Sequence, residues 1–357
     1  ELLTDLKNDR FDVAMGGITV RPERSIAGRF TVPITTSGAV ILIPEASPFV
    51  TTRDLDRTDL QIAVNSGGHL EQVARAHFPN ARIRAMDQNQ NVIRALAQGD
   101  VDAAVSDTRE SVIWQNSHPS LRALEPFTRD RKAWLVTAQR PGLARDLDAW
   151  LLSAQADGRL DGLRAQELAE VPSTAAVTEP LPALLAAVDE RLALMPWVAK
   201  AKRSTGTPVE APEVEARVLQ AAVADVRAAE QRNPAAHARN EDDIRRFFRT
   251  QIEAAKAVQR RTLASAPSNT EHPPPDLVRE LRPALLRLGD RIATLVVALP
   301  LNLQEAQVRE AVRRELNSPR LHEEDKSAIA DALVELVVQT EPAVLSGSAA
   351  EGRTLDQ

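Results

Sequence analysis

The sequence of 357 residues contains no cysteine, few aromatic residues (3%) and only six lysines among its 44 basic residues. The absence of cysteine excludes disulfides, thiolate metal ligands and a cysteine nucleophile. Six histidines are present, but none of them forms an HxH or HExxH pair. The sequence therefore predicts no metal site and no cofactor.

Two further absences concern partners. No apolar run approaches the ~20 residues that cross a bilayer, and the net charge of −6 argues against a nucleic-acid partner. The length suggests two or three domains. There is no initiator Met and no signal-peptide pattern, and residues 1–6 have the apolar spacing of the second half of a helix. We therefore expect the chain to start inside an element, so that its localisation cannot be read from a targeting segment.

Residues 1–170 alternate strand-like and helical segments. Apolar runs at 11–15, 38–43, 60–64 and 101–105 predict strands, and the period of 92–97 predicts a helix. Strand, helix and strand at this spacing favour an α/β fold with parallel pairing. Ligands of such sheets collect at the carboxyl ends of strands, where the Gly16-Gly17 and Gly67-Gly68 pairs and Asp107 fall.

The composition changes near residue 171. Residues 171–181 are a linker rich in Pro, Ser, Thr and Ala, and 346–357 form a small, polar tail that we expect to be disordered. Between them, 182–345 is predicted to be an all-helical domain. Its predicted helices span 182–203, 211–232, 240–264, 276–298, 303–316 and 324–340.

The segment 16–24 is the first candidate for a ligand site. A strand that ends in two glycines lets a ligand approach the backbone, Thr19 offers a hydroxyl, and Arg24 can bind a carboxylate with two hydrogen bonds. The alternative is a β-turn followed by a solvated arginine.

The order of residues here resembles the type II periplasmic solute-binding proteins of the polar-amino-acid family. The residues that fit the family pattern D-x-x-x-x-G-I-T-x-x-x-x-R … F-T-x-P are Asp12, Gly17, Ile18, Thr19, Arg24, Phe30, Thr31 and Pro33. The resemblance implies a two-lobed α/β domain over 1–170, in which Arg24 binds the ligand carboxylate and Thr19, Gly68 and Asp107 line the site. Members begin with about two more strands, so the resemblance also implies an incomplete first lobe.

Within that family, Asn65 to Arg75, Asn89 and Ser106-Asp107 resemble the cyclohexadienyl dehydratases. Such an enzyme protonates a departing ring hydroxyl while a carboxylate leaves as CO2, which requires a general acid. The resemblance assigns this role to Glu71, with His69 as a ligand contact or a helper to Glu71. The alternative is a glutamate that only complements the dipole of its helix.

The clearest segment of the helical half is Phe247 to Gln259. Phe248, Ile252, Ala255 and Gln259 share one helical face. Elsewhere in the helical half, Arg191 and Lys202 upstream and Arg282 downstream accompany apolar helix faces, which would be costly in a core unless an anion were bound there. The alternative is an ordinary hydrophobic core with Gln259 at its solvent-accessible edge.

This combination resembles the secreted, AroQ-type (gamma subclass) chorismate mutases over about residues 185–300. The matching motifs are Glu190-Arg191-Leu192, Val198-Ala199, Lys202, Pro208-Val209-Glu210, Phe247 to Gln259 and Leu281 to Leu285. By this resemblance Arg191 and Arg282 bind the two carboxylates of chorismate, and Lys202 and Gln259 donate hydrogen bonds to the ether oxygen.

The chain departs from the mutase pattern at two positions. Ala211 and Val214 stand where the family has Asp and an Arg that reaches the pocket. Arg217, one turn beyond Val214 on the same face, is the candidate substitute.

Together the two resemblances imply a bifunctional enzyme of phenylalanine biosynthesis, periplasmic or secreted, with chorismate and prephenate as its small-molecule substrates. Prephenate, the product of the mutase, is a substrate of the dehydratase. A homo-oligomer is among the states that the sequence allows. One alternative is a solute-binding protein for an amino or keto acid with a helical appendage, and another is a pair in which only one domain is active.

Overall fold

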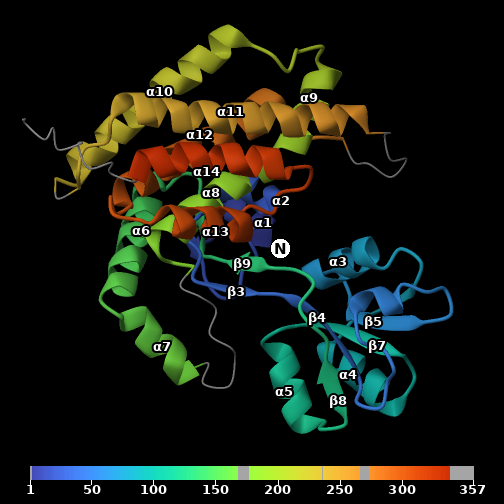
Figure 1. Ribbon diagram of the computed structural model, residues 1–357. Coiled ribbons are helices and arrows are strands. Elements are labelled where there is room, and N and C mark those ends of the chain that lie inside the picture. Colours follow the sequence, from blue (N-terminus) through green and yellow to red (C-terminus); the bar gives the residue numbers. More distant parts are fainter. Residues whose placement is uncertain (1, 168–176, 235, 266–272, 338–357) are drawn as a thin grey trace, which may run out of the picture.

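The computed structural model describes residues 2–167, 177–234, 236–265 and 273–337 of the chain. Two α/β lobes lie below a helical domain (Figure 1). The first lobe is built from α1 (Leu2–Lys7), β1 (Val13–Ala14), α2 (Pro22–Ala27), β2 (Gly28–Phe30), β10 (Leu135–Thr137), α6 (Pro141–Ala156) and α7 (Arg159–Glu167). Its sheet has the antiparallel order β1-β10-β2.

The second lobe is a five-stranded mixed sheet between helices. Its elements are β4 (Ala39–Pro44), the short 3-10 helix Thr52–Leu55, β5 (Gln61–Asn65), α3 (His69–His77), β6 (Arg82–Met86), α4 (Asn89–Gln98), β7 (Ala103–Asp107), α5 (Glu110–Ser117) and β8 (Leu121–Ala123). The strand order is β6-β5-β7-β4-β8, with β5 parallel to β6 and β7. This confirms the predicted parallel pairing of residues 60–64 with 101–105.

The central strand β5 shows why the sheet is buried on both faces. Ile62 and Val64 point to the apolar cluster that includes Ala74 of α3, and Ala63 points to the cluster that includes Leu96 of α4. Because side chains alternate along a strand, a continuous apolar run serves both faces.

Two antiparallel strands, β3 (Thr35–Ser37) and β9 (Asp130–Lys132), carry the chain between the lobes. Strand β3 continues into β4 of the second lobe, and β9 returns into β10 of the first. Figure 1 shows this pair directly beneath the helical domain.

The helical domain consists of α8 (Pro180–Ala193), α9 (Met195–Ser204), α10 (Pro212–Arg232), α11 (Glu241–Ala264), the π-helix η2 (Leu277–Leu281), α12 (Arg282–Ala298), α13 (Glu305–Glu315) and α14 (Glu323–Val337). The predicted helix 182–203 is wrong in one respect, since it is two helices separated at Leu194. Pro196 in the first turn of α9 has no amide hydrogen for residue 192 and so breaks the continuous helix. The predicted tail 346–357 and residues 171–176 of the predicted linker lie outside the described residues.

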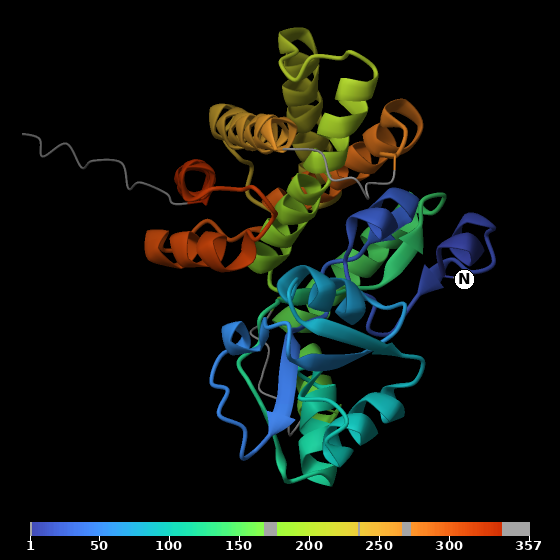
Figure 2. The same cartoon turned by 90° about the vertical axis from the view of Figure 1, so that its right-hand side faces the viewer.

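The helical domain lies against the first lobe (Figure 2), and the two share one apolar core. Val32, Leu151 and Ala154 of the first lobe belong to the same buried cluster as the residues of α8 and α12. Arg291 of α12 donates to Glu190 Oε2 at 2.9 Å and to the carbonyl of Thr31 at 2.8 Å. The described end of the predicted linker is also fixed, because the Thr178 hydroxyl donates to the carbonyl of Pro33 at 2.8 Å.

Candidate functional sites

The first candidate site lies where the turn 16–19 meets β9. Gly16 and Gly17 both have positive φ (104° and 53°), a conformation that disfavours side chains and leaves the turn open on its outer side. Arg24 Nη1 donates to the carbonyl of Thr19 at 2.8 Å, and Lys132 Nζ donates to the Thr19 hydroxyl at 2.7 Å. Two cations therefore meet at one buried threonine.

Both cations are partly buried. Burial lowers the pKa of Arg24, and nearby Arg21 lowers it further. Burial also lowers the pKa of Lys132, while Asp130 and Asp107 oppose that change. Burial removes these two cations from water, so a bound anion would stabilise their charged forms.

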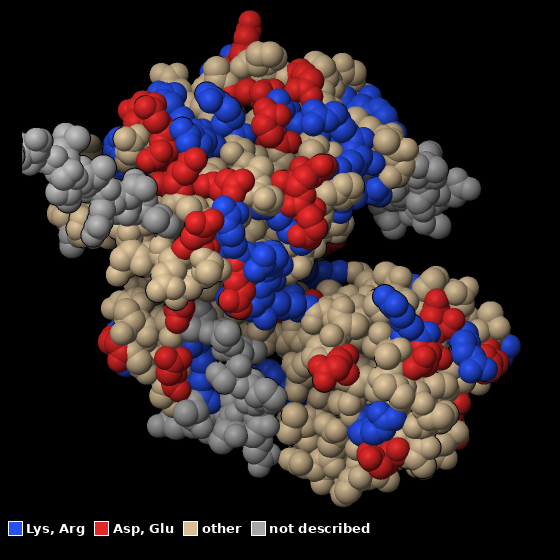
Figure 3. Space-filling view, viewed as in Figure 1, with Lys and Arg blue, Asp and Glu red and all other residues tan. Residues whose placement is uncertain are grey.

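The opposite wall of the site comes from the second lobe. Gly68 is the N-cap of α3, and His69 Nε2 lies 2.8 Å from Asp130 Oδ1 on β9. Arg21 also contacts Gln72 across the two lobes. Figure 3 shows a notch between the second lobe and the rest of the molecule, with Lys and Arg side chains gathered beside it.

Glu71 occupies the first turn of α3. One carboxylate oxygen accepts the amide of Gly67 at 2.7 Å, and the other accepts Arg75 at 2.8 and 3.0 Å. Both interactions favour the ionised form, and the amide of Gly67 is the larger cause of the lowered pKa of Glu71. In this arrangement Glu71 is a first-turn glutamate that binds the amide preceding the N-cap and pairs with Arg75, which is the arrangement that the alternative interpretation of the sequence expects.

Asp107 ends β7 and caps α5, because its Oδ1 accepts the amides of Arg109 and Glu110 at 2.9 Å. The neighbouring Glu110 receives hydrogen bonds from Ser106 and Asn89, and burial raises its pKa. Sequence reasoning missed Glu110, although Asn89 and Ser106 were in the motif. A carboxyl group with a raised pKa lies at the carboxyl edge of the sheet.

The strand β9 divides its side chains between two neighbours. Asp130 and Lys132 face the site between the lobes, as their contacts with His69 and Thr19 show. Arg131 faces the helical domain and donates to Asp189 Oδ2 of α8 at 2.7 Å. This alternation is the pleat of a strand, with a ligand site on one face and a domain interface on the other.

The second candidate site lies where α8, α9, α11 and η2 pack together. Arg191 on α8 is partly buried, and desolvation lowers its pKa to about 10. Its buried Nε has no partner among the described residues, and no carboxylate contributes to its pKa. A partly buried guanidinium without a counter-ion suits an anionic ligand.

Lys202 and Gln259 add hydrogen-bond donors to this region. Lys202 Nζ donates to the carbonyl of Val209 at 3.1 Å, and burial lowers its pKa. Gln259 is 4% exposed, its Nε2 lies 3.6 Å from the sulfur of Met195, and its Oε1 has no partner among the described residues. A thioether is a weak acceptor, so Nε2 of this buried amide can still donate to a stronger acceptor.

The two remaining predicted arginines are more peripheral. Arg282 begins α12 and is exposed, which differs from the expectation that it points into a core; its charge nevertheless lowers the pKa of Lys202. Arg217 on α10 is also exposed, and no contact among the described residues joins it to Lys202 or Gln259. Arg191, Lys202 and Gln259 thus lie on α8, α9 and α11, which pack against one another, and no contact among the described residues adds Arg217 to them.

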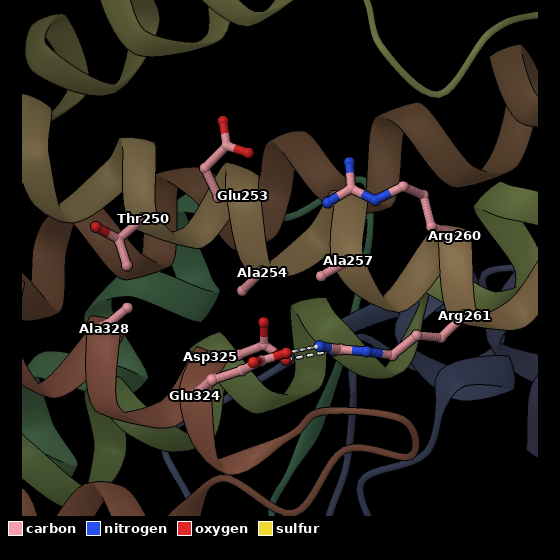
Figure 4. A pocket seen from close by; sticks show the side chains of 9 residues that line it. All are labelled: Thr250, Glu253, Ala254, Ala257, Arg260, Arg261, Glu324, Asp325 and Ala328. Atoms are coloured by element: carbon pink, nitrogen blue, oxygen red, sulfur yellow. Dashed lines mark hydrogen bonds and ion pairs between the residues drawn. The ribbon is translucent and has the colours of Figure 1, made fainter.

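A separate pocket of about 240 Å³ opens between α11 and α14 (Figure 4). Arg261 closes one side by pairing with Glu324 at 2.6 Å and with Asp325. The cation here already has its counter-ions, and none of the predicted substrate-binding residues lines the pocket. Among the residues that the structure describes, no group of His, Asp and Glu is arranged to hold a metal ion. No described helix is long and apolar enough to span a membrane.

Two family models match the chain. Residues 1–169 match "Bacterial extracellular solute-binding proteins, family 3", and residues 182–260 match "Chorismate mutase type II". The chain is therefore similar to solute-binding proteins over residues 1–169 and to chorismate mutases over residues 182–260. This confirms the predicted fold class, an α/β two-lobed domain followed by an all-helical one.

Curated relatives match the first domain. The chain is 32% identical over 140 residues to cyclohexadienyl dehydratase of Pseudomonas aeruginosa, covering 38% of this chain and 52% of that protein. It is 27% identical over 120 residues to ABC transporter arginine-binding protein 1 of Escherichia coli, covering 34% and 48%. The chain thus spans about half the length of the curated relatives it matches.

Among solved structures, an ancestral amino acid-binding protein described as a precursor of cyclohexadienyl dehydratase is 26% identical. It aligns with a TM-score of 0.42 over 46% of this chain and 72% of that one.

Proposed function

We propose that the protein is a bifunctional enzyme of phenylalanine biosynthesis. The helical domain would rearrange chorismate to prephenate, and the two-lobed domain would convert prephenate to phenylpyruvate, or arogenate to phenylalanine. The match of residues 182–260 to chorismate mutase and the similarity of the first domain to a cyclohexadienyl dehydratase support this pairing. The observation that carries the proposal is Arg191, a partly buried cation without a counter-ion among the described residues, in a domain similar to enzymes of a dianionic substrate.

The mutase step requires no covalent intermediate. Arg191 and Arg282 would bind the two carboxylates of chorismate, which holds the substrate folded. As the carbon–oxygen bond opens, negative charge develops on the ether oxygen, and Lys202 Nζ and Gln259 Nε2 would donate hydrogen bonds to it. The new carbon–carbon bond forms in the same step. The weak thioether partner of Gln259 supports this role, because the substrate oxygen would be the better acceptor.

The pocket lacks the arginine that the mutase family brings from the helix after the Pro-Val-Glu motif. We propose that Arg217 supplies this guanidinium group to the pocket when substrate is bound. Arg217 lies on α10 one turn beyond Val214, and it is exposed and without an ion pair among the described residues, so it is free to turn.

In the dehydratase step, Arg24 and Thr19 would bind a carboxylate of prephenate, with Gly68, His69 and Asp107 completing the site. Glu71 would transfer its proton to the ring hydroxyl, which leaves as water. The electron pair of the breaking carbon–carbon bond enters the ring as CO2 departs, so the ring becomes aromatic and charge is conserved. Glu71 must be protonated for this, and closure of the site around substrate would desolvate its carboxyl group.

One observation favours a second candidate, a solute-binding protein for an amino or keto acid. The pKa of Glu71 is lowered and its carboxylate is paired with Arg75, which suits a helix cap better than an acid. A binding protein needs Arg24 but needs no acid in the site. In that case only the helical domain would be an enzyme.

The matched family is described as bacterial and extracellular. We therefore propose a periplasmic or secreted location. The homo-oligomeric state stays a prediction.

One experiment tests both reactions. The protein is incubated with chorismate, and prephenate and phenylpyruvate are measured separately over time. We expect prephenate to rise and then fall as phenylpyruvate accumulates. Accumulation of prephenate alone would support the second candidate, and unchanged chorismate would refute the mutase proposal.

A further inference from the structure

Lys132 is a cation of the first site that neither the sequence motifs nor the proposed mechanism uses. It lies on β9, and its Nζ is 2.7 Å from the Thr19 hydroxyl. Arg24 reaches the carbonyl of the same threonine at 2.8 Å. The ammonium and the guanidinium thus converge on one buried residue from two elements, β9 and α2.

Neither cation has a carboxylate within ion-pair distance among the described residues. The nearby carboxylates are engaged elsewhere. Asp130 lies 2.8 Å from His69 Nε2 and accepts the Thr128 hydroxyl at 3.1 Å. Asp107 accepts the first amides of α5.

The electrostatic surroundings of Lys132 agree with this geometry. Arg24 and Arg109 both disfavour its charged form, and Asp130 and Asp107 favour it. Two like charges held together at a partly buried site are costly unless ligand anions separate them. One ligand carboxylate would satisfy Arg24 and leave Lys132 unpaired.

We infer that Lys132 binds a second carboxylate, so that Arg24 and Lys132 together select a ligand with two carboxylate groups. The inference deepens the proposed function and rests on it for the identity of the ligand. Prephenate has two carboxylates, whereas phenylpyruvate keeps only one, because the other leaves as CO2. Lys132 would therefore hold substrate more tightly than product, which favours release after each turnover.

The test compares these two ligands by calorimetric titration. The variants Lys132→Met and Lys132→Arg are made in a Glu71→Gln background, so that bound prephenate is not consumed. Lys7→Met is the matched control, since Lys7 is an exposed lysine of the same lobe. Mutase activity and thermal unfolding of each variant check that the protein is folded.

We expect Lys132→Met to weaken prephenate binding by roughly 10- to 100-fold, the worth of one charge-assisted hydrogen bond. Phenylpyruvate binding should change by less than about threefold, and Lys132→Arg should restore most of the preference for prephenate. Lys7→Met should change neither ligand.

Other outcomes separate this inference from the proposed function. Equal weakening of both ligands would overturn the inference, because Lys132 and Arg24 would then share one carboxylate; so would no weakening of either. A protein that binds prephenate through Lys132 but forms no phenylpyruvate would support the inference and refute the dehydratase. A wild-type protein that binds neither ligand would overturn both.

Discussion

Arg191 carries a charge that the protein itself does not neutralise, so its substitution should have opposite effects on stability and activity. Its folded-state pKa, about 10, lies below the ordinary 12.5, so at neutral pH the charged form destabilises the fold, and the penalty is relieved only above about pH 10. We expect Arg191→Met to raise Tm by about 2–4 °C and to lower kcat/KM for chorismate by at least ~10²-fold.

Differential scanning calorimetry and a chorismate assay on one preparation measure both effects. Arg203→Met, at an exposed arginine of α9, is the control and should change neither quantity. A lower Tm in Arg191→Met would mean that the guanidinium is a structural hydrogen-bond donor.

Glu71 is the second residue whose protonation can be tested. If it is the general acid, Glu71→Gln should reduce phenylpyruvate formation by about 10²-fold or more while chorismate consumption continues. The amide of Gly67 and then Arg75 lower the pKa of Glu71, so Arg75→Met should raise that pKa. Because a higher pKa keeps the acid protonated to a higher pH, the alkaline limb of the dehydratase profile should move to higher pH.

The control for this series is Arg94→Met, which removes an exposed arginine from α4 of the same lobe. An unmoved limb together with full activity in Glu71→Gln would remove Glu71 from the mechanism and direct attention to Glu110.

Gln259 can be tested by making its hydrogen bond depend on pH. In Gln259→Glu the side chain donates to the ether oxygen only while it is protonated, so kcat for chorismate should survive at low pH and fall as the pH rises. Gln251→Glu is the matched control, because Gln251 is a buried glutamine of the same helix with no partner for its amide among the described residues. It should lose stability without this pH dependence. A flat profile in Gln259→Glu at the wild-type rate would make Gln259 an ordinary core residue.

At the scale of elements, two arginines of different burial, one on β9 and one just before it, bind carboxylates of the helical domain. Arg131 is 10% exposed and pairs with Asp189 and Glu315, while Arg129 is 32% exposed and pairs with Glu315. Arg131→Met leaves Asp189 without its cation, and we expect a loss on the order of 3 kcal/mol in the free energy of unfolding. Arg129→Met should cost less than about 1 kcal/mol. Urea unfolding measures both, and equal losses would contradict the distinction between buried and exposed pairs.

The elements that the sequence predicts correctly are those with a strong period or a continuous apolar run. Strand β5 has three consecutive buried apolar residues, and α11 has a regular apolar face. The short strand β9 has the sequence Asp-Arg-Lys, and no apolar pattern marks it because its two faces meet a ligand site and charged groups of another domain. Tertiary pairing with β3 decides its structure.

The same reason limits what could be predicted of the sites. Arg24, His69 and Arg191 stand in motifs, so the sequence alone proposes them as site residues. Lys132 and Glu110 reach their positions only through long-range packing of β9 and of α5. The scarcity of lysine was the one available signal for Lys132, and it does not say which lysine faces a ligand.

At the scale of the whole molecule, the distribution of apolar cores predicts how the protein unfolds. The first lobe and the helical domain share one buried cluster, to which the first lobe adds a smaller cluster around Phe30, whereas the second lobe has two clusters that it shares with neither. We therefore expect the first lobe and the helical domain to unfold together and the second lobe to unfold separately.

Tryptophan fluorescence in urea can follow each part. Trp134 packs on the shared cluster from the first lobe, Trp197 packs on it from α9, and Trp114 packs in the second lobe. Single-tryptophan variants should give one midpoint for Trp134 and Trp197 and another for Trp114. Distinct midpoints for Trp134 and Trp197 would show that the first lobe and the helical domain are independent folding units.

The pleat of β9 also restricts how this chain can change in length. Deleting one residue between β8 and β9 would shift the strand by one position against β3, and every side chain on β9 would then turn to the opposite face. Arg131 would enter the ligand site, and Lys132 would point at Asp189 of the helical domain, so charge would still be matched at the interface while the site lost its ammonium group. The variant protein would keep the interface between the two domains, but its site between the lobes would contain a guanidinium group in place of the ammonium group. In relatives of this protein, the loop between β8 and β9 should therefore either keep its length or differ in length by two residues at a time.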